Sequence, residues 1–270
     1  PNNLTTVTYP DTKVRTYLYN ESAHTAGASL PNTLTGLIDE NNNRFATWTY
    51  DSQGRTVSSQ HAGGAELTTL NYGTGTSTSV TDALGTVRTT NLTTILNVVR
   101  STGSSQPGGS GCAASSSALT YDANGNVSSR SDFNGNKVCY GYETGVTPAR
   151  NLEVKRVEGL ASTAACSTVL TTPPAPTTAN PVRSVSTQWH SYWRMPVKVA
   201  EPLKLTTYVY NGDTYNSSVV TCAPAGATVP SITGTGTQPI GVLCQKVEQA
   251  TTHTTGSAGF CAPLASGASA

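Results

Sequence analysis

The chain has 270 residues, of which only 11% are charged, and its formal net charge is +1. An average soluble domain has about 25% charged residues, and this chain has no cluster of Lys and Arg to neutralise phosphates, so we expect no nucleic-acid partner. No apolar run reaches the roughly 18 residues that a membrane span requires, and no basic start followed by an apolar stretch marks a signal peptide. The chain begins at Pro1 within a repeat-like phrase, so we expect it to be a piece of a longer protein.

Short alternating runs bounded by turn residues follow one another from the start of the chain. Residues 45–50 ("FATWTY") and 137–142 ("KVCYGY") alternate in this way, whereas apolar residues rarely recur at helical spacing. Thr and Val are frequent and there are 12 Tyr, and these residues suit a pleated, half-buried surface. The sequence therefore predicts an all-β fold of antiparallel hairpins.

An Asp-x-x-Gly phrase recurs where these runs end. Asp at the first position of a type I turn accepts a hydrogen bond from a backbone N–H two residues on, and Gly at the fourth position takes a left-handed conformation. Asn42 or Asn43 replaces Gly in a related phrase that starts at Asp39. We interpret the phrases as structural turns in preference to calcium loops. The predicted turn residues are Asp51 and Gly54, Asp82 and Gly85, Asp122 and Gly125, and Asp132 and Gly135.

Three irregular stretches separate the repeats. They lie near 101–117, which is rich in Gly and Ser, 161–180, which contains a Pro-rich stretch, and 222–244, which is made of small residues. Stretches of this length in a β-repeat predict surface inserts.

The doublet "YDANGNVSSRSDFNGNKVCYGYE" (121–143) closely resembles the YD repeat of the RHS (rearrangement hot spot) family. The phrases at 37–48, 46–59 and 189–213 are similar to RHS repeat units, and the resemblance extends from about Tyr9 to Gln249. It implies a long antiparallel sheet that spirals into a hollow shell, as in bacterial polymorphic toxins whose shell encloses a C-terminal toxin domain. The chain has no Asp-Pro dipeptide of the kind that the family's autoproteolysis motif contains, so we expect the cleavage motif and the toxin to lie outside it.

Catalytic and metal-binding patterns are missing from the sequence. His24, His61, His190 and His253 lie far apart, without ligand spacing or a Cys-x-x-Cys. We therefore predict no catalytic residue, no metal, no cofactor and no enzyme activity. Trp189, Tyr192 and Trp193 form an aromatic cluster, which we interpret as packing over a sheet, with a glycan contact as the alternative.

Six cysteines allow several disulfide pairings. Cys222 and Cys244 flank one insert and are the predicted pair. Cys139 lies on a predicted strand and has two candidate partners, Cys112 and Cys166. Reduced cysteines in a protein held in the cytoplasm until delivery are the alternative for all six.

We therefore expect residues 1–270 to be a single segment of an RHS-repeat shell that encapsulates and protects a toxin, in a bacterial protein that is secreted or delivered to target cells. The expected partners are the remainder of the same chain and the C-terminal toxin. The alternative is a YD-repeat adhesin at the cell surface that binds glycans.

Overall fold

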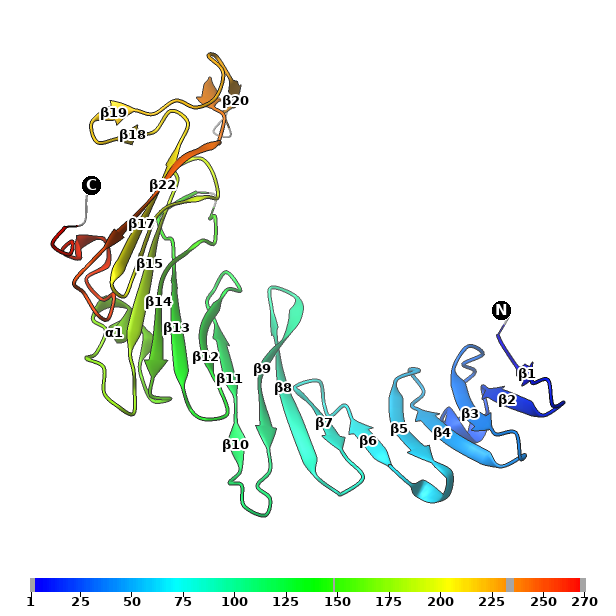
Figure 1. Cartoon of the computed structure of the whole chain (residues 1–270). Helices are drawn as coiled ribbons and strands as arrows, with labels where there is room; N and C mark the ends of the chain where they lie inside the picture. The colour runs from blue at the N-terminus through cyan, green and yellow to red at the C-terminus, as the bar shows by residue number, and fades with distance from the viewer. Residues whose placement is uncertain (1–2, 148, 232–235, 268–270) are drawn as a thin grey trace. The chain divides into compact units, whose positions relative to one another are not determined.

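A computed structural model describes residues 3–147, 149–231 and 236–267. It divides the chain into two compact units, residues 1–116 and residues 117–270, each built on its own antiparallel sheet (Figure 1). The protein is all-β, as predicted: the described residues include one short α-helix and three 3₁₀ turns.

Unit 1 is a ten-stranded meander in which each strand pairs with the next one along the chain (Figure 1). Two 3₁₀ turns, η1 (Ser22–His24) and η2 (Ala62–Gly64), lie in its connections. Its strands are β1 (Thr6–Thr8), β2 (Val14–Tyr19), β3 (Leu34–Ile38), β4 (Arg44–Tyr50), β5 (Thr56–His61), β6 (Thr68–Asn71), β7 (Ser77–Thr81), β8 (Val87–Ile95), β9 (Val98–Gln106) and β10 (Ser115–Ser116).

Unit 2 has an eight-stranded sheet in which the first seven strands follow chain order and β22 pairs with β17. The segment between β17 and β22 forms two small ribbons, β18–β19 and β20–β21. The strands of unit 2 are β11 (Ala118–Tyr121), β12 (Val127–Ser131), β13 (Lys137–Tyr142), β14 (Glu153–Leu160), β15 (Arg183–Trp189), β16 (Pro196–Glu201), β17 (Lys204–Tyr210), β18 (Thr214–Tyr215), β19 (Ser218–Val219), β20 (Thr228–Pro230), β21 (Thr237–Pro239) and β22 (Leu243–Ala250); α1 (Cys166–Thr171) and the 3₁₀ turn η3 (Gly259–Cys261) complete it.

Unit 1 has little apolar core. Among its described residues Ala46 is the one buried hydrophobic side chain, whereas Thr25 and Thr35 are fully buried polar residues. A polar network supports this region: Arg44 forms two hydrogen bonds with the Glu21 carboxylate, at 2.9 and 2.8 Å, and Thr35 donates to the same carboxylate at 2.7 Å. Backbone pairing and hydrogen-bonded side chains therefore stabilise this unit more than apolar burial does.

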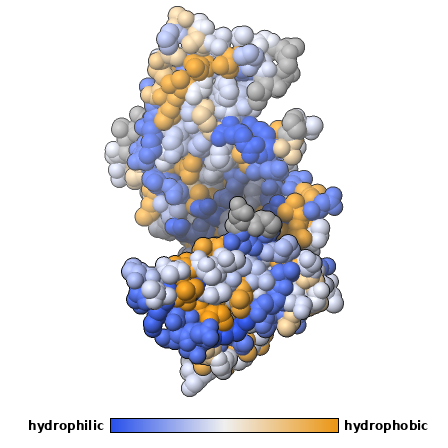
Figure 2. Space-filling model, turned by 90° about the vertical axis from the view of Figure 1, so that its right-hand side faces the viewer, coloured by the Kyte–Doolittle hydropathy of each residue, from blue (hydrophilic) through white to orange (hydrophobic). Residues whose placement is uncertain are grey.

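Unit 2 has a small apolar cluster where α1 packs on one face of β13 and β14. Five residues of this cluster are buried, namely Cys139, Val157, Leu160, Val169 and Val182. On the face drawn in Figure 2, hydrophobic residues lie in small groups among polar ones.

The predicted inserts need correction at their boundaries. In 101–117, residues up to Gln106 belong to β9 and Ser115–Ser116 form β10, so only 107–114 and Ser117 lie outside strands. The many Gly and Ser residues predicted a loop here, but β9 pairs with β8 from Val98 to Ser105, with a shift of register at Thr102. The Thr90 and Ser104 hydroxyls lie 3.3 Å apart across this pair.

The other two inserts also contain regular structure. Residues 161–180 are more than a surface crossing, because they include α1, whose Val169 is only 7% exposed against the sheet. Residues 222–244 contain the β20–β21 ribbon and the start of β22.

Candidate functional site

The four predicted Asp-x-x-Gly turns share one geometry. In each, an oxygen of the Asp carboxylate accepts hydrogen bonds from two backbone N–H groups, two and four residues on, at 2.8–3.0 Å. Gly54, Gly85 and Gly125 have φ of 79° and Gly135 has φ of 82°, which agrees with the left-handed position expected for them. Asn42 takes that position in the Asp39 turn, with φ of 63°. These aspartates therefore build turns with their carboxylates.

Hydrogen bonds lower the pKa of the Asp carboxyl at three of these turns. The backbone N–H of Arg55 lowers the pKa of Asp51 and that of Thr86 lowers the pKa of Asp82, while the Asn136 side chain and backbone lower the pKa of Asp132. An exposed carboxylate whose pKa is lowered suits the capping of backbone N–H groups and not the delivery of protons.

A second recurring device, which the sequence analysis did not identify, is a tyrosine brace. A tyrosine at or just after the end of a strand donates its hydroxyl to the backbone carbonyl of the first residue of the preceding strand, at 2.7–2.9 Å. Burial raises the pKa of three of these phenols, Tyr50, Tyr142 and Tyr210. The four braces join Tyr50 to Leu34, Tyr72 to Thr56, Tyr142 to Val127 and Tyr210 to Pro196.

The tyrosine brace explains why Tyr stands directly before a turn. The accepting carbonyl belongs to the first residue of its strand, so the phenol adds a hydrogen bond at the end of the sheet. The sequence signal for the brace is a Tyr followed by a polar residue. It occurs at Tyr50, Tyr142 and Tyr210. Each bond spans 14 to 16 residues, so the sequence shows the donor tyrosine but not the carbonyl that accepts its hydrogen bond.

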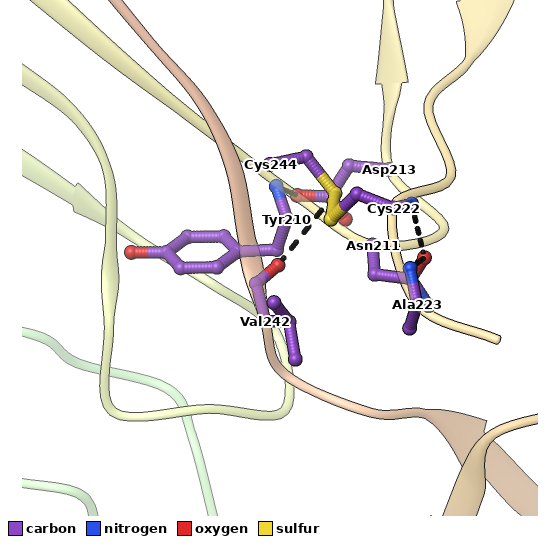
Figure 3. The surroundings of a disulfide bond; sticks show 7 residues. All are labelled: Tyr210, Asn211, Asp213, Cys222, Ala223, Val242 and Cys244. Carbon is purple, nitrogen blue, oxygen red and sulfur yellow. Dashed lines mark hydrogen bonds between the residues drawn. A yellow bond between two sulfur atoms is a disulfide. The ribbon is translucent and has the colours of Figure 1, made fainter.

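The structure joins Cys222 to Cys244, the predicted pair, with their Cα atoms 5.6 Å apart (Figure 3). The Asn211 side-chain oxygen accepts hydrogen bonds from the backbone N–H groups of Cys222 and Ala223, at 2.9 and 3.1 Å. The Cys244 sulfur lies 3.8 Å from the Val242 carbonyl oxygen, a contact and not a hydrogen bond, because a disulfide sulfur carries no proton. This disulfide fixes the start of β22 to the segment that follows β19.

The open choice for Cys139 is decided in favour of Cys166, with the Cα atoms 5.4 Å apart. This bond fastens α1 to β13 within the apolar cluster of unit 2. Cys112 and Cys261 are exposed and carry no disulfide. The alternative in which all six cysteines are reduced therefore does not hold in this structure.

The predicted aromatic cluster does not form a single platform. Trp189 lines an open pocket of about 670 Å³ in unit 2, and its indole N–H donates to the Glu153 carbonyl at 2.7 Å. Tyr192 and Trp193 line a second, smaller pocket of about 150 Å³. Trp193 also packs closely on Gly241, where an added Cβ would lie 3.0 Å from the indole nitrogen.

His190 lies between these two pockets, and it is not isolated as the sequence indicated. Its Nδ1 accepts hydrogen bonds from the backbone N–H groups of Tyr192 and Trp193, at 3.1 and 3.2 Å. Because Nδ1 is an acceptor, Nε2 carries the proton and donates it to Asp213 at 3.2 Å. The other carboxylate oxygen of Asp213 accepts from the Tyr210 N–H at 3.1 Å, so this histidine links the β15–β16 turn to the end of β17.

No cluster of His, Cys, Asp or Glu within residues 3–147, 149–231 and 236–267 could hold a metal ion. In the same ranges, no helix has the length and apolar character needed to cross a membrane. No motif in the sequence indicates the partnership of His190 with Asp213, which lies 23 residues further along the chain.

Comparisons with known proteins give structural likeness only. No family model matches the sequence, and no curated protein matches it. Among solved structures, the chain is similar to one titled "Crystal Structure of TcdB2-TccC3-Cdc42", at 13% identity and a TM-score of 0.44, and to "Crystal Structure of TcdB2-TccC3", at 12% identity and a TM-score of 0.43.

The first of these likenesses covers 94% of this chain and 12% of the other, and the second covers 96% and 13%. The chain therefore spans about an eighth of the length of those proteins. A third, "Crystal Structure of TcdB2-TccC3 without hypervariable C-terminal region", has 13% identity and a TM-score of 0.30. At these values the comparisons assign no family and no function to the chain.

Proposed function

We propose that the chain is a structural segment of an RHS-type β-shell, which encloses and protects a C-terminal toxin domain in a secreted or delivered bacterial protein. The observation that carries the proposal is the repeated hairpin unit. Each unit combines alternating strands, an Asp-x-x-Gly or related turn and, at four places, a tyrosine brace. Such a unit is suited to building a long wall, because it stabilises each hairpin through contacts with its neighbours in the sheet.

The small apolar core supports the same proposal. A wall that is wet on both faces cannot bury a thick apolar layer, so its stability must come from backbone ladders and polar side chains. Unit 1 has this character, with Ala46 as its one buried hydrophobic side chain in the described range. The disulfides fasten two long connections of unit 2 to its sheet.

Protease protection tests the shell function. The intact protein that carries this sequence would be treated with a nonspecific protease, and the survival of its C-terminal region followed by mass spectrometry. The C-terminal region should survive much longer in the intact protein than when it is expressed alone. Equal cleavage rates in the two forms would contradict the proposal.

We also propose that the chain has no catalytic activity of its own. The support is chemical: the turn aspartates cap backbone N–H groups, and in the pair of His190 with Asp213 both Asp oxygens and the His Nδ1 are engaged by neighbouring groups. Purified chain should show no turnover with hydrolase, nuclease and glycosidase substrates. Turnover that disappears in the His190→Gln variant, while the fold persists, would refute this.

Glycan binding by a cell-surface adhesin is the second candidate function. The observation that favours it is the 670 Å³ pocket of unit 2, which Trp189 lines together with polar side chains. Loss of glycan binding in the Trp189→Ala variant would support it, and undiminished binding would exclude this pocket.

A further inference from the structure

The floor of the 670 Å³ pocket is a row of polar side chains on one face of the unit 2 sheet. Gln188 on β15 pairs directly with Lys198 on β16, and Lys198 pairs directly with Thr207 on β17. Residues paired across antiparallel strands point to the same face of the sheet. All three line the pocket, as do Leu205 and its β22 partner Gln249. An amide, an ammonium group and a hydroxyl thus lie side by side across three strands.

Lys198 has no ion-pair partner among the described residues. Within the part of the chain that the structure describes, it makes no hydrogen bond and no ion pair, although it is half-buried. The one acidic residue that lines the pocket is Asp213, and both of its carboxylate oxygens are engaged, by His190 and by the Tyr210 N–H. The pocket lining therefore has no net formal charge, and Lys198 is its one charged group without a hydrogen-bond or ion-pair partner among the described residues.

The wall of the pocket is fixed in one arrangement. His190 is held at Nδ1 by two backbone N–H groups and at Nε2 by Asp213, so the turn after β15 is anchored to the end of β17. Trp189 is held by its hydrogen bond to the Glu153 carbonyl. A site whose side chains are already ordered binds a ligand with less loss of conformational entropy.

We infer that this pocket binds a saccharide that bears a carboxylate group. Lys198 binds the carboxylate, Gln188 and Thr207 exchange hydrogen bonds with ring hydroxyls, and Trp189 supplies aromatic surface for the sugar ring. The volume, about 670 Å³, is within the range of pockets that hold small ligands.

The geometry favours a saccharide over an acidic peptide. Extended peptides bind most often by adding a strand to a sheet edge, where backbone groups are free. The floor of this pocket is a sheet face, and the strands β15, β16 and β17 have their backbone groups paired on both sides. On this floor only side chains are available to a ligand, and most of the floor residues that line the pocket are neutral.

This inference goes beyond the shell function and specifies the ligand for the second candidate function. The test uses the intact protein and three probes at about 150 mM salt, where weak surface attraction is screened. The probes are a tetrasaccharide that alternates glucuronate with N-acetylglucosamine, the neutral tetramer of N-acetylglucosamine, and an acidic tetrapeptide. Binding is measured by isothermal titration calorimetry.

The glucuronate tetrasaccharide should bind the wild-type protein more tightly than either other probe. Lys198→Gln should weaken its binding about tenfold, because it removes one charge-assisted hydrogen bond. Lys246→Gln is the control: Lys246 does not line the pocket, and its ammonium group forms an ion pair with Glu248 at 2.8 Å, so the same chemical change is made outside the pocket. This control should leave the affinity unchanged.

Three results would overturn the inference. They are equal weakening by the two lysine variants, binding of the neutral tetramer or the acidic peptide as tight as that of the glucuronate tetrasaccharide, and no heat of binding with any probe. Circular dichroism of each variant shows whether the fold is retained. None of these results changes the outcome expected in the protease-protection test. The saccharide proposal can therefore be refuted while the shell proposal stands, and the reverse is also possible.

Discussion

Gly159 allows a quantitative test of how the sheet of unit 2 is assembled. It lies in β14 with φ of 70°, and a Cβ added there would lie 2.4 Å from the Pro181 carbonyl oxygen. Gly135 has a similar φ of 82°, but its nearest neighbour would be Ser162 Cβ at 4.0 Å. The two glycines therefore separate the cost of backbone strain from the cost of a steric clash.

The expected destabilisation differs between the two sites. Alanine at positive φ costs about 1 kcal/mol, so Gly135→Ala should lower the free energy of unfolding by about that amount. Gly159→Ala has the same strain and must also move the Pro181 backbone by about 1 Å to restore ordinary contact at 3.4 Å. Overpacking of this kind costs about 1–3 kcal/mol, so the total should be about 2–4 kcal/mol.

Urea unfolding followed by circular dichroism measures both variants, and asparagine provides the control. Asn tolerates positive φ, so Gly135→Asn should be nearly neutral, whereas Gly159→Asn should remain strongly destabilising because its Cβ meets the same carbonyl. If Gly159→Ala cost no more than Gly135→Ala, the close approach between β14 and Pro181 would be wrong.

Three other predictions concern the brace, the disulfide and the turns. Tyr142→Phe should lower the free energy of unfolding by about 1 kcal/mol, through loss of the 2.9 Å bond to the Val127 carbonyl. Tyr140 is the control, because its hydroxyl makes no hydrogen bond among the described residues, and Tyr140→Phe should leave the free energy of unfolding unchanged. An equal loss of stability in the two variants would contradict the brace. Replacing Cys139 and Cys166 with Ala opens a loop of 27 residues, so it should lower the free energy of unfolding by about 3 kcal/mol. Peptide mapping without reductant should find Cys139 joined to Cys166, and a bond from Cys139 to Cys112 would refute the pairing. Asn136 lowers the folded pKa of Asp132 below its unfolded value, so this carboxylate stabilises the fold above about pH 4, and its contribution is lost as the pH falls through the folded pKa. Unfolding measured from about pH 6 to about pH 2 should therefore depend less on pH in Asp132→Asn than in the wild type, and identical curves would exclude the turn carboxylate as a source of acid sensitivity.

The sequence by itself determined the local chemistry of this protein. Each Asp-x-x-Gly turn is stabilised by contacts within four residues, so the phrase alone predicted the positive φ of Gly54, Gly85, Gly125 and Gly135. The alternation between turns was enough to predict an all-β fold. Cys222 and Cys244 could be paired because they flank one excursion from the sheet.

Long-range contacts were decided by the tertiary structure. Cys112 and Cys166 are each 27 residues from Cys139, so spacing could not choose between them. The choice depends on α1 packing on the face of β13 that carries Cys139 and Gly141. The sequence alternation defined two faces of this strand but could not tell which one would be covered.

The pocket residues depend in the same way on strand register. Gln188, Lys198 and Thr207 become neighbours because three strands pair with one alignment, and a shift of one residue would place each side chain on the other face. His190 and Asp213 likewise meet only when the β15–β16 turn and the end of β17 lie at the same edge of the sheet. Turn chemistry acts within a few residues and can be read from the chain, whereas register is set by the sum of many pairings across the sheet and exists only in the folded protein.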